Sequence, residues 1–393
     1  MLKYFFFLLL LPPLRLSFWL GAKRTLPLWL RVLGIVLFFL ISQQFTLNRL
    51  FFGALSGPDM PHLLLLCQSA ALTALVIAFF CVLAQDLWHG LAFLAGALRW
   101  RKSQPNPGRR AFCSQLLVCS VPALGIGAGI SGVVQGTSHP ACVTRTVHLA
   151  HRPSALQGLR IALLTDLHVG PLTDLAWARG IVARVREARP DLICLAGDLS
   201  DGQLNYRSAD GSTRQQVASC LGELSAPLGV FACTGNHEYY SDYTGWMQLY
   251  QRLGFRFLHN TSVMLTHNGA RFVLGGRDDR QSRPYFHRPT PSVEEVFSGQ
   301  PWHGEQVLRI LLDHRPDRAF ENAACADLQL SGHTHGGQCL GFDRLVARVN
   351  HGFLRGWYTV EDMQLYVCPG TGLWSGFPVR LGVASEIALI TLA

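Results

Sequence analysis

The chain has 393 residues, of which 49% are apolar and 15% are charged, against roughly 25% charged residues in a typical soluble domain. Its mean hydropathy is positive at +0.22, so a membrane-embedded part is expected. The net charge of +9 comes from residues 1–140, which hold 11 basic and two acidic residues, whereas 23 of each follow. The neutral remainder excludes a basic face for nucleic acid, so no nucleic-acid partner is expected.

Three segments near the amino terminus are apolar and long enough to cross a bilayer, which takes about 20 helical residues. They are residues 26–45, 61–85 and 111–134. A fourth segment, 4–21, is interrupted by two prolines and an arginine, and it is a short span, a re-entrant piece or an uncleaved signal-like segment. Residues 1–140 are therefore predicted to form a transmembrane region with three to four helices.

The basic residues between these segments predict how the region is oriented. The 96–110 connection carries five Arg or Lys residues and no acidic residue, so the positive-inside rule places it in the cytoplasm. The 46–60 connection then lies on the far side, and the last span delivers residues after 135 to the outside. We therefore expect a multi-pass protein of the cell (inner) membrane whose carboxyl-terminal domain is extracytoplasmic.

Two adjacent arginines precede the last apolar segment. Gly108-Arg109-Arg110 followed by a Gly/Ala-rich apolar run is similar to a twin-arginine export signal. Two arginines that merely flank a membrane span also explain the pattern. Both interpretations stay open.

The domain predicted over residues 150–393 alternates strand-like and helix-like segments. Short buried strands are predicted at 159–165, 191–196, 229–233, 308–312 and 327–330. Helices are predicted over 173–188 and 242–253, a Gly-containing hairpin over 256–280, and two strands within 362–393. These elements predict an α/β sandwich of two sheets with flanking helices.

A polar cluster follows each of the five buried strands, at the end where open α/β sheets bind ligands. The clusters are Asp166-Leu167-His168, Gly197-Asp198-Leu199-Ser200-Asp201, Gly235-Asn236-His237-Glu238, His314 and Gly332-His333-Thr334-His335. Side chains at i and i+2 of an extended chain point to one side, so the first Asp–His pair and the last His–His pair can each enter one site together. Carboxylates, imidazoles and one amide, without a thiolate, suit divalent Mn, Fe or Zn.

This pattern resembles the calcineurin-like metallophosphoesterase family, whose motifs are D-x-H, G-D-x-x-D, G-N-H-[DE], a lone His and G-H-x-H. Every motif occurs here, in order and after a predicted strand, over about residues 158–393. The motif sequences TDLHxG, GNHEYY and SGHTHGGQ are most similar to those of the membrane-associated bacterial branch. The resemblance implies a two-sheet metallophosphoesterase sandwich and the activity of a metal-dependent phosphoric ester hydrolase.

The resemblance also implies a binuclear centre of two divalent metal ions and the residues that hold it. Its ligands would be Asp166, His168 and His335 for the first ion, Asp198 as a bridge, and Asn236, His314 and His333 for the second. Two neighbouring cations would neutralise phosphate oxygens and generate a bridging hydroxide for in-line attack. His237 would act beside Asp198 in catalysis, by bonding a phosphate oxygen or protonating the leaving group. Asp201 and Glu238 would orient the ligands.

The expected function is hydrolysis of a phosphodiester or phosphomonoester by a membrane-anchored enzyme. An alternative is a lipid-linked pyrophosphate hydrolase of the UDP-diacylglucosamine type from lipid A synthesis, whose substrate is handled on the cytoplasmic leaflet, against the charge distribution of this chain. A catalytically silent metal-binding scaffold would usually have lost ligands, and none of the seven is missing here.

Overall fold

The computed structural model describes residues 9–23, 26–52, 59–98, 107–149, 153–207, 210–299 and 307–393. The chain divides into two compact units. The first comprises Met1–Gly53 and Leu63–Val134, and the second comprises Ala54–His62 and Gln135–Ala393. The start of the predicted segment 4–21 and most of the basic connection 96–110 lie outside the described residues.

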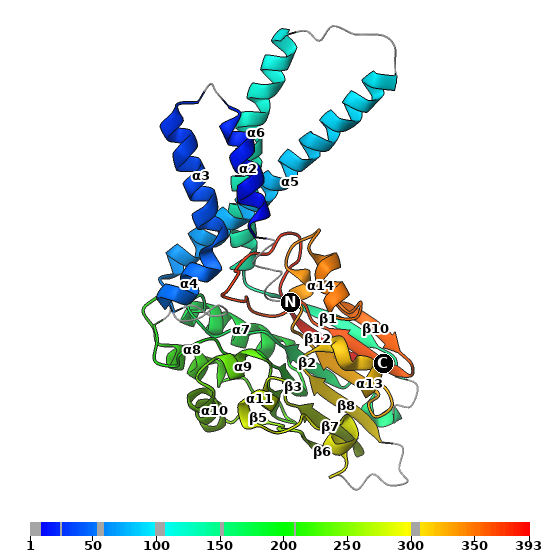
Figure 1. Cartoon of the computed structure of the whole chain (residues 1–393). Helices are drawn as coiled ribbons and strands as arrows, with labels where there is room; N and C mark the ends of the chain where they lie inside the picture. Colours follow the sequence, from blue (N-terminus) through cyan, green and yellow to red (C-terminus); the bar gives the residue numbers. More distant parts are fainter. Residues whose placement is uncertain are drawn as a thin grey trace. The chain divides into compact units, whose positions relative to one another are not determined.

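The first unit is helical (Figure 1). Its elements are α2 (Leu11–Gly21), α3 (Leu28–Ser42), α4 (Gln44–Phe52), α5 (His62–Leu98) and α6 (Pro107–Gly136). Leu and Ala dominate α5, and both are strong helix formers. The stretch His62–Ala95 of α5 is long and apolar enough to cross a membrane, and α3 with α4 meets the same criterion as one span bent by 64°. Length and composition therefore give one or two candidate spans among the described residues. The predicted segment 111–134 lies in α6, and part of its side chains lie outside the described residues.

The first sheet of the second unit has six strands in the order β1-β12-β2-β3-β4-β5. The strands are β1 (Ala141–Val147), β12 (Glu386–Leu392), β2 (Arg160–Leu164), β3 (Leu192–Ala196), β4 (Val230–Cys233) and β5 (Arg256–Phe257). β2, β3 and β4 run parallel, with Leu163 beside Cys194 and Leu195 beside Ala232. Their near-continuous apolar sequences suit strands that are covered on both faces.

The second sheet also has six strands, in the order β10-β11-β9-β8-β7-β6. The strands are β10 (Gly356–Val360), β11 (Met363–Val367), β9 (Leu328–Ser331), β8 (Leu308–Asp313), β7 (Ala270–Arg277) and β6 (Thr261–His267). β6 and β7 form a hairpin whose two turn residues, Asn268 and Gly269, both adopt positive φ. An Asn-Gly turn of this kind matches the twist of the strands it joins.

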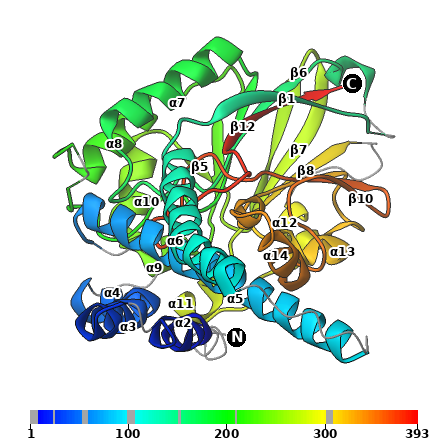
Figure 2. The same cartoon turned by 90° about the horizontal axis from the view of Figure 1, so that it is seen from above.

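Apolar side chains from both sheets fill the space between them, and helices cover the outer faces (Figure 2). The first sheet is covered by α7 (Leu175–Ala188), α8 (Arg214–Leu221) and α10 (Tyr243–Arg252), and the second by α12 (Val293–Phe297) and α13 (Ala319–Asn322). In α7 the buried residues Ala178, Ile181, Val182 and Val185 recur at helical spacing, so one face packs on the sheet. The helix begins where the Asp174 side chain accepts the Trp177 N–H at 2.7 Å.

The predicted α/β sandwich of two sheets is confirmed, and all five strands that carry polar clusters lie within two residues of their predicted bounds. Three short helices complete the unit: α9 (His237–Tyr240), α11 (Ser282–Phe286) and α14 (Asp343–Val349). The edge strands β1 and β10 were not predicted. β1 lies between the predicted ranges 1–140 and 150–393 and pairs in parallel with β12.

Candidate metal centre

The predicted ligands lie at the carboxyl ends of β2, β3 and β4 in one sheet and of β8 and β9 in the other. Five of the seven adopt the left-handed backbone conformation that non-glycine residues rarely use. They are Asp166, His168, Asp198, His333 and His335, with φ between 47° and 69°. Such conformations cost about 1–3 kcal/mol each and cluster at functional sites, where the surrounding fold holds them. The local backbone is therefore bent to aim these side chains.

Two glycines allow the strand ends to approach one another. A Cβ on Gly235 would lie 2.5 Å from the backbone N of Asp198 and closer still to its carboxylate. A Cβ on Gly332 would overlap the Thr165 hydroxyl and the Asp166 carboxylate. Glycine is therefore required at both positions because two of the predicted ligands touch the facing backbone.

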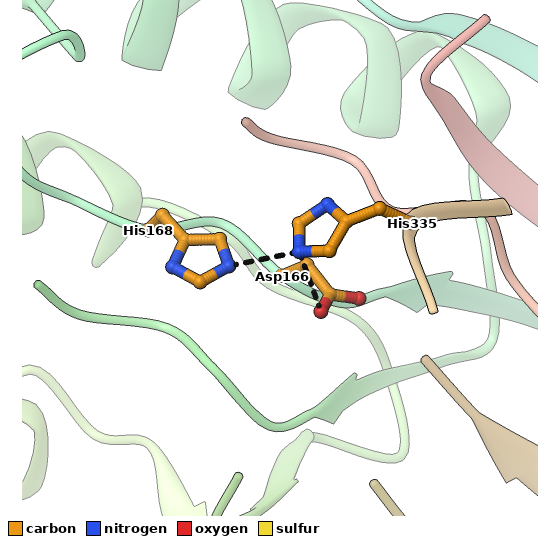
Figure 3. A group of neighbouring side chains, drawn as sticks. All are labelled: Asp166, His168 and His335. Carbon is orange, nitrogen blue, oxygen red and sulfur yellow. Dashed lines mark hydrogen bonds and ion pairs between the residues drawn. The ribbon is translucent and has the colours of Figure 1, made fainter. Parts of the chain in front are cut away.

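Asp166, His168 and His335 form the first group of potential ligands (Figure 3). Nε2 of His168 lies 3.2 Å from Nε2 of His335, which lies 3.4 Å from Oδ1 of Asp166. Two facing imidazole nitrogens can share at most one proton, whereas a cation between them would be bound by both lone pairs.

Asp198, His314 and His333 form a second group, and Asp198 also belongs to a third with His168 and His237. Oδ2 of Asp198 lies 3.1 Å from Nε2 of His314 and 3.9 Å from Nε2 of His168. Its other oxygen accepts the backbone N–H of His237 at 2.8 Å. One carboxylate thus lies between the two sets of histidines.

Several buried atoms that could coordinate a metal ion lack hydrogen-bond partners among the described residues. Oδ1 of Asn236 is buried and unpaired, and Nε2 of His314 approaches Asp198 without hydrogen-bond geometry. Leaving such atoms unpaired costs free energy, which a bound cation would recover. Together with the imidazole and carboxylate donors, these atoms fit divalent metal ions.

Neighbouring groups fix the orientation of the ligands. Nδ1 of His314 faces the carbonyl of Ala196 at 2.8 Å, and Nδ1 of His168 faces Oδ1 of Asp201 at 3.1 Å. In both rings the proton then belongs on Nδ1, so Nε2 turns its lone pair toward the centre. Glu238 accepts backbone N–H bonds from Asp198, Leu199 and Gly235 and so braces the turns that carry the ligands.

Burial and charge set the protonation of the ligands. Burial raises the pKa of Asp198, but the imidazoles of His314 and His237 outweigh it and hold the pKa well below its ordinary value. Burial lowers the pKa of His333 and of His335 well below the ordinary value, and the Arg315 guanidinium beside His333 adds to the effect. Asp198 is therefore ionised and His333 and His335 are neutral, the forms that bind metals. Burial lowers the pKa of His314, but the Asp198 carboxylate outweighs it and raises the pKa to about 10, so a cation that binds His314 would displace a proton.

Several residues that the sequence motifs did not identify also line the centre. Arg315 donates from Nη1 to Nε2 of His333 at 2.7 Å and from Nε to Asp279 at 2.5 Å. The rings of Tyr240 and Trp374 flank His237, with centroids 5.6 and 6.3 Å away. Two of them had a signal in the sequence: Arg315 directly follows the lone His314, and Tyr240 ends the GNHEYY motif.

One further polar contact comes from a distant part of the chain. Ser375 donates to Oδ2 of Asp201 at 2.5 Å, while Oδ1 of the same carboxylate bonds His237 at 2.5 Å. Asp201 therefore holds two histidines and a serine at once. No motif in the sequence marked Ser375.

Comparison with known proteins places this centre in a family. The profile of the calcineurin-like phosphoesterase family matches residues 159–337, which include all seven predicted ligands. A transmembrane protein with metallophosphoesterase domain from Danio rerio is 30% identical over 84% of this chain and 74% of its own length. Its namesake from Bos taurus is 31% identical over 93% of this chain and 80% of its own length.

A bacterial relative extends the comparison. An uncharacterized metallophosphoesterase from Helicobacter pylori is 31% identical over 66% of this chain and 66% of its own length. The similarity therefore includes both vertebrate proteins named for a membrane region and bacterial metallophosphoesterases. The chain belongs to the calcineurin-like phosphoesterase family and is a metal-dependent phosphoric ester hydrolase.

Proposed function

We propose that this chain is a membrane-anchored phosphoesterase that binds two divalent metal ions and cleaves a phosphodiester or phosphomonoester. The observation that carries the proposal is the position of Asp198, which lies within reach of both His168 and His314. A carboxylate shared between two groups of ligands suits two neighbouring ions that have one ligand in common. Oxygen and nitrogen donors without thiolate favour Mn, Fe or Zn.

The bound ions would supply Lewis acidity, which neutralises phosphate oxygens and makes water a stronger acid. Individual side chains would bind the phosphate and transfer the proton. His237 is held through Nδ1 by Asp201, so its other ring nitrogen is left for a phosphate oxygen or for protonation of the leaving group. Arg315 adds a fixed positive charge beside His333, where an anionic ester would bind. The rings of Tyr240 and Trp374 lie beside His237 and would contact the group bound there.

We further propose that the chain is a multi-pass protein of the cell membrane and that the metal centre lies on the extracytoplasmic side. The basic connection 96–110 supports this orientation through the positive-inside rule. The second unit supports an even number of crossings, because it includes residues 59–62 as well as Gln135–Ala393. The chain between these stretches must therefore return to the side from which it left, and two crossings by α5 and α6 would achieve this.

A buried ion pair connects Asp59 to the part of the second unit that holds the metal centre. Nη2 of Arg214 donates to Asp59 at 2.5 Å, and Nη1 of the same arginine donates to the carbonyl of Asp201 at 2.8 Å. The Arg214 side chain is fully buried. A buried charge of this kind must keep its partner, which supports a common location for Asp59 and the metal centre.

The test is to purify the full-length chain in detergent and to assay bis(p-nitrophenyl) phosphate and p-nitrophenyl phosphate with Mn, Fe or Zn. We expect hydrolysis that a chelator abolishes and that Asp198→Asn lowers at least about a hundredfold, because the shared ligand loses its charge. Asp174→Asn is the matched control, since Asn also caps helices well. Activity that survives both chelation and Asp198→Asn would refute the proposal, and cleavage of lipid-linked pyrophosphates alone would favour the alternative substrate.

A further inference from the structure

The segment Leu340–Val349, which contains α14, leaves large apolar side chains exposed on the second unit. Leu340, Phe342, Leu345 and Val349 are 61%, 45%, 55% and 46% exposed, and α14 itself has no buried residue. Isolated exposed apolar residues are normal, but a contiguous group marks a surface that binds something. We refer to this segment as the α14 surface.

One side of the α14 helix contacts the protein, and another side is exposed. Asp343 lies against Gly337 of η3 (His335–Gly337) and pairs with Arg355 at 3.7 Å, so this side faces the protein. Phe342, Leu345 and Val349 recur at intervals of three and four residues, which places them together on one exposed strip. The helix is therefore fixed through Asp343 and presents an apolar strip outward.

A basic strip runs beside the apolar one. Arg344 and Arg348 are four residues apart, both are exposed, and neither forms an ion pair with any residue that the structure describes. An apolar strip next to free arginines is the pattern of a helix that lies in the interface of a membrane, with apolar side chains among the lipids and basic ones at the headgroups.

The α14 surface lies close to the start of the larger part of the second unit, in the last turn of α6. The backbone N–H of Leu340 bonds the carbonyl of Leu381 at 3.0 Å, and the next residue, Gly382, donates its N–H to Oε1 of Gln135 at 3.1 Å. Gln135 directly follows the apolar stretch that ends at Val134. Leu381 and Gly382 thus connect the exposed apolar surface to the last turn of α6.

We propose that the α14 surface docks on an anionic lipid bilayer, with Phe342, Leu345 and Val349 in the interfacial region and Arg344 and Arg348 on lipid phosphates. This inference rests on the membrane attachment proposed above and adds a second, peripheral contact from the catalytic unit. A second copy of the chain is a poorer occupant, because a two-fold contact through this small surface would bring like-charged arginines together.

The docking would also connect the bilayer to the metal centre. η3 begins at the predicted ligand His335, and its residue Gly337 packs against Asp343 of α14. A helix held at the headgroup layer therefore contacts the same short turn that carries a ligand.

The experiment uses the full-length chain, reconstituted in vesicles of phosphatidylcholine alone or of an equal mixture with phosphatidylglycerol. Leu345→p-benzoylphenylalanine places a photocrosslinker on the apolar strip, and Gln248→p-benzoylphenylalanine places one on exposed α10 as the matched control. We expect lipid adducts from position 345 and not from position 248, with a higher yield in the anionic vesicles. Arg344→Gln and Arg348→Gln should each lower that yield about fivefold, since each removes one charge near an anionic surface.

Flotation of the vesicles and ester hydrolysis are measured on the same samples. A chain that floats and is active but gives no lipid adduct from position 345 would overturn the docking and leave the proposed function intact. Adducts to a second copy would overturn it in favour of a dimer contact. A chain that does not float with the vesicles would overturn the membrane attachment and the docking with it, whereas a floating chain without hydrolysis contradicts only the proposed activity.

Discussion

Substitution of His237 can distinguish a role in metal binding from a role in proton transfer. Its imidazole is held by Asp201 at 2.5 Å and lies in one group with Asp198, but it is not one of the seven predicted ligands. His237→Ala should therefore leave the metal content of the protein unchanged. A positioned proton donor contributes about 10²–10⁴ to a rate, so we expect kcat to fall by about that factor for esters with alkyl leaving groups.

The dependence on the leaving group identifies the role of His237. A p-nitrophenolate departs without a proton, so His237→Ala should cost far less with p-nitrophenyl esters than with alkyl esters. The assay is kcat across a series of phosphodiesters, with metal content measured in parallel. His259→Ala is the matched control, because His259 also bonds a carboxylate, Asp278 at 2.9 Å, outside the groups of potential ligands. An equal loss across the series would refute proton donation, and an unchanged rate would refute any catalytic role.

Two further predictions concern packing and pH. Gly235→Ala should lower metal content and activity at least about tenfold, because its Cβ would displace Asp198, whereas Gly299→Ala, which has open space, should change neither. Burial lowers the pKa of His259, but Asp278 outweighs it and raises the net value, so this pair stabilises the fold below about pH 6.5 and the stabilisation is lost as the pH rises through the folded pKa. The difference in Tm between wild type and His259→Gln should therefore be larger in acidic buffer than in alkaline buffer.

The sequence predicts the central strands of this fold well, because each apolar run is followed by a recognisable polar motif. A short apolar run followed by Asp166 or by His333 is strong evidence for a strand that ends at a ligand site. The left-handed backbone at both residues could not be predicted, since nothing but the facing strand ends holds it there. Motif spacing thus predicts which residues are ligands but not the backbone conformation that orients them.

The remaining features depend on contacts between distant parts of the chain. Strand β1 (Ala141–Val147) is largely exposed, and its pairing with β12 is what makes it a strand. Ser375 reaches Asp201 across 174 residues of sequence and belongs to no motif. The exposed strip at Leu345 has the composition of a buried helix face, so composition alone predicts the wrong environment.

The central claim is that Asp198 is shared by two metal ions. The most direct test is the number of divalent ions bound per chain, measured by elemental analysis of the purified full-length protein after saturation and removal of free metal. We predict two ions in the wild type and at most one in Asp198→Asn, with Asp174→Asn unchanged at two. A saturated wild-type chain that holds a single ion, or an Asp198→Asn variant that still holds two, would contradict the account.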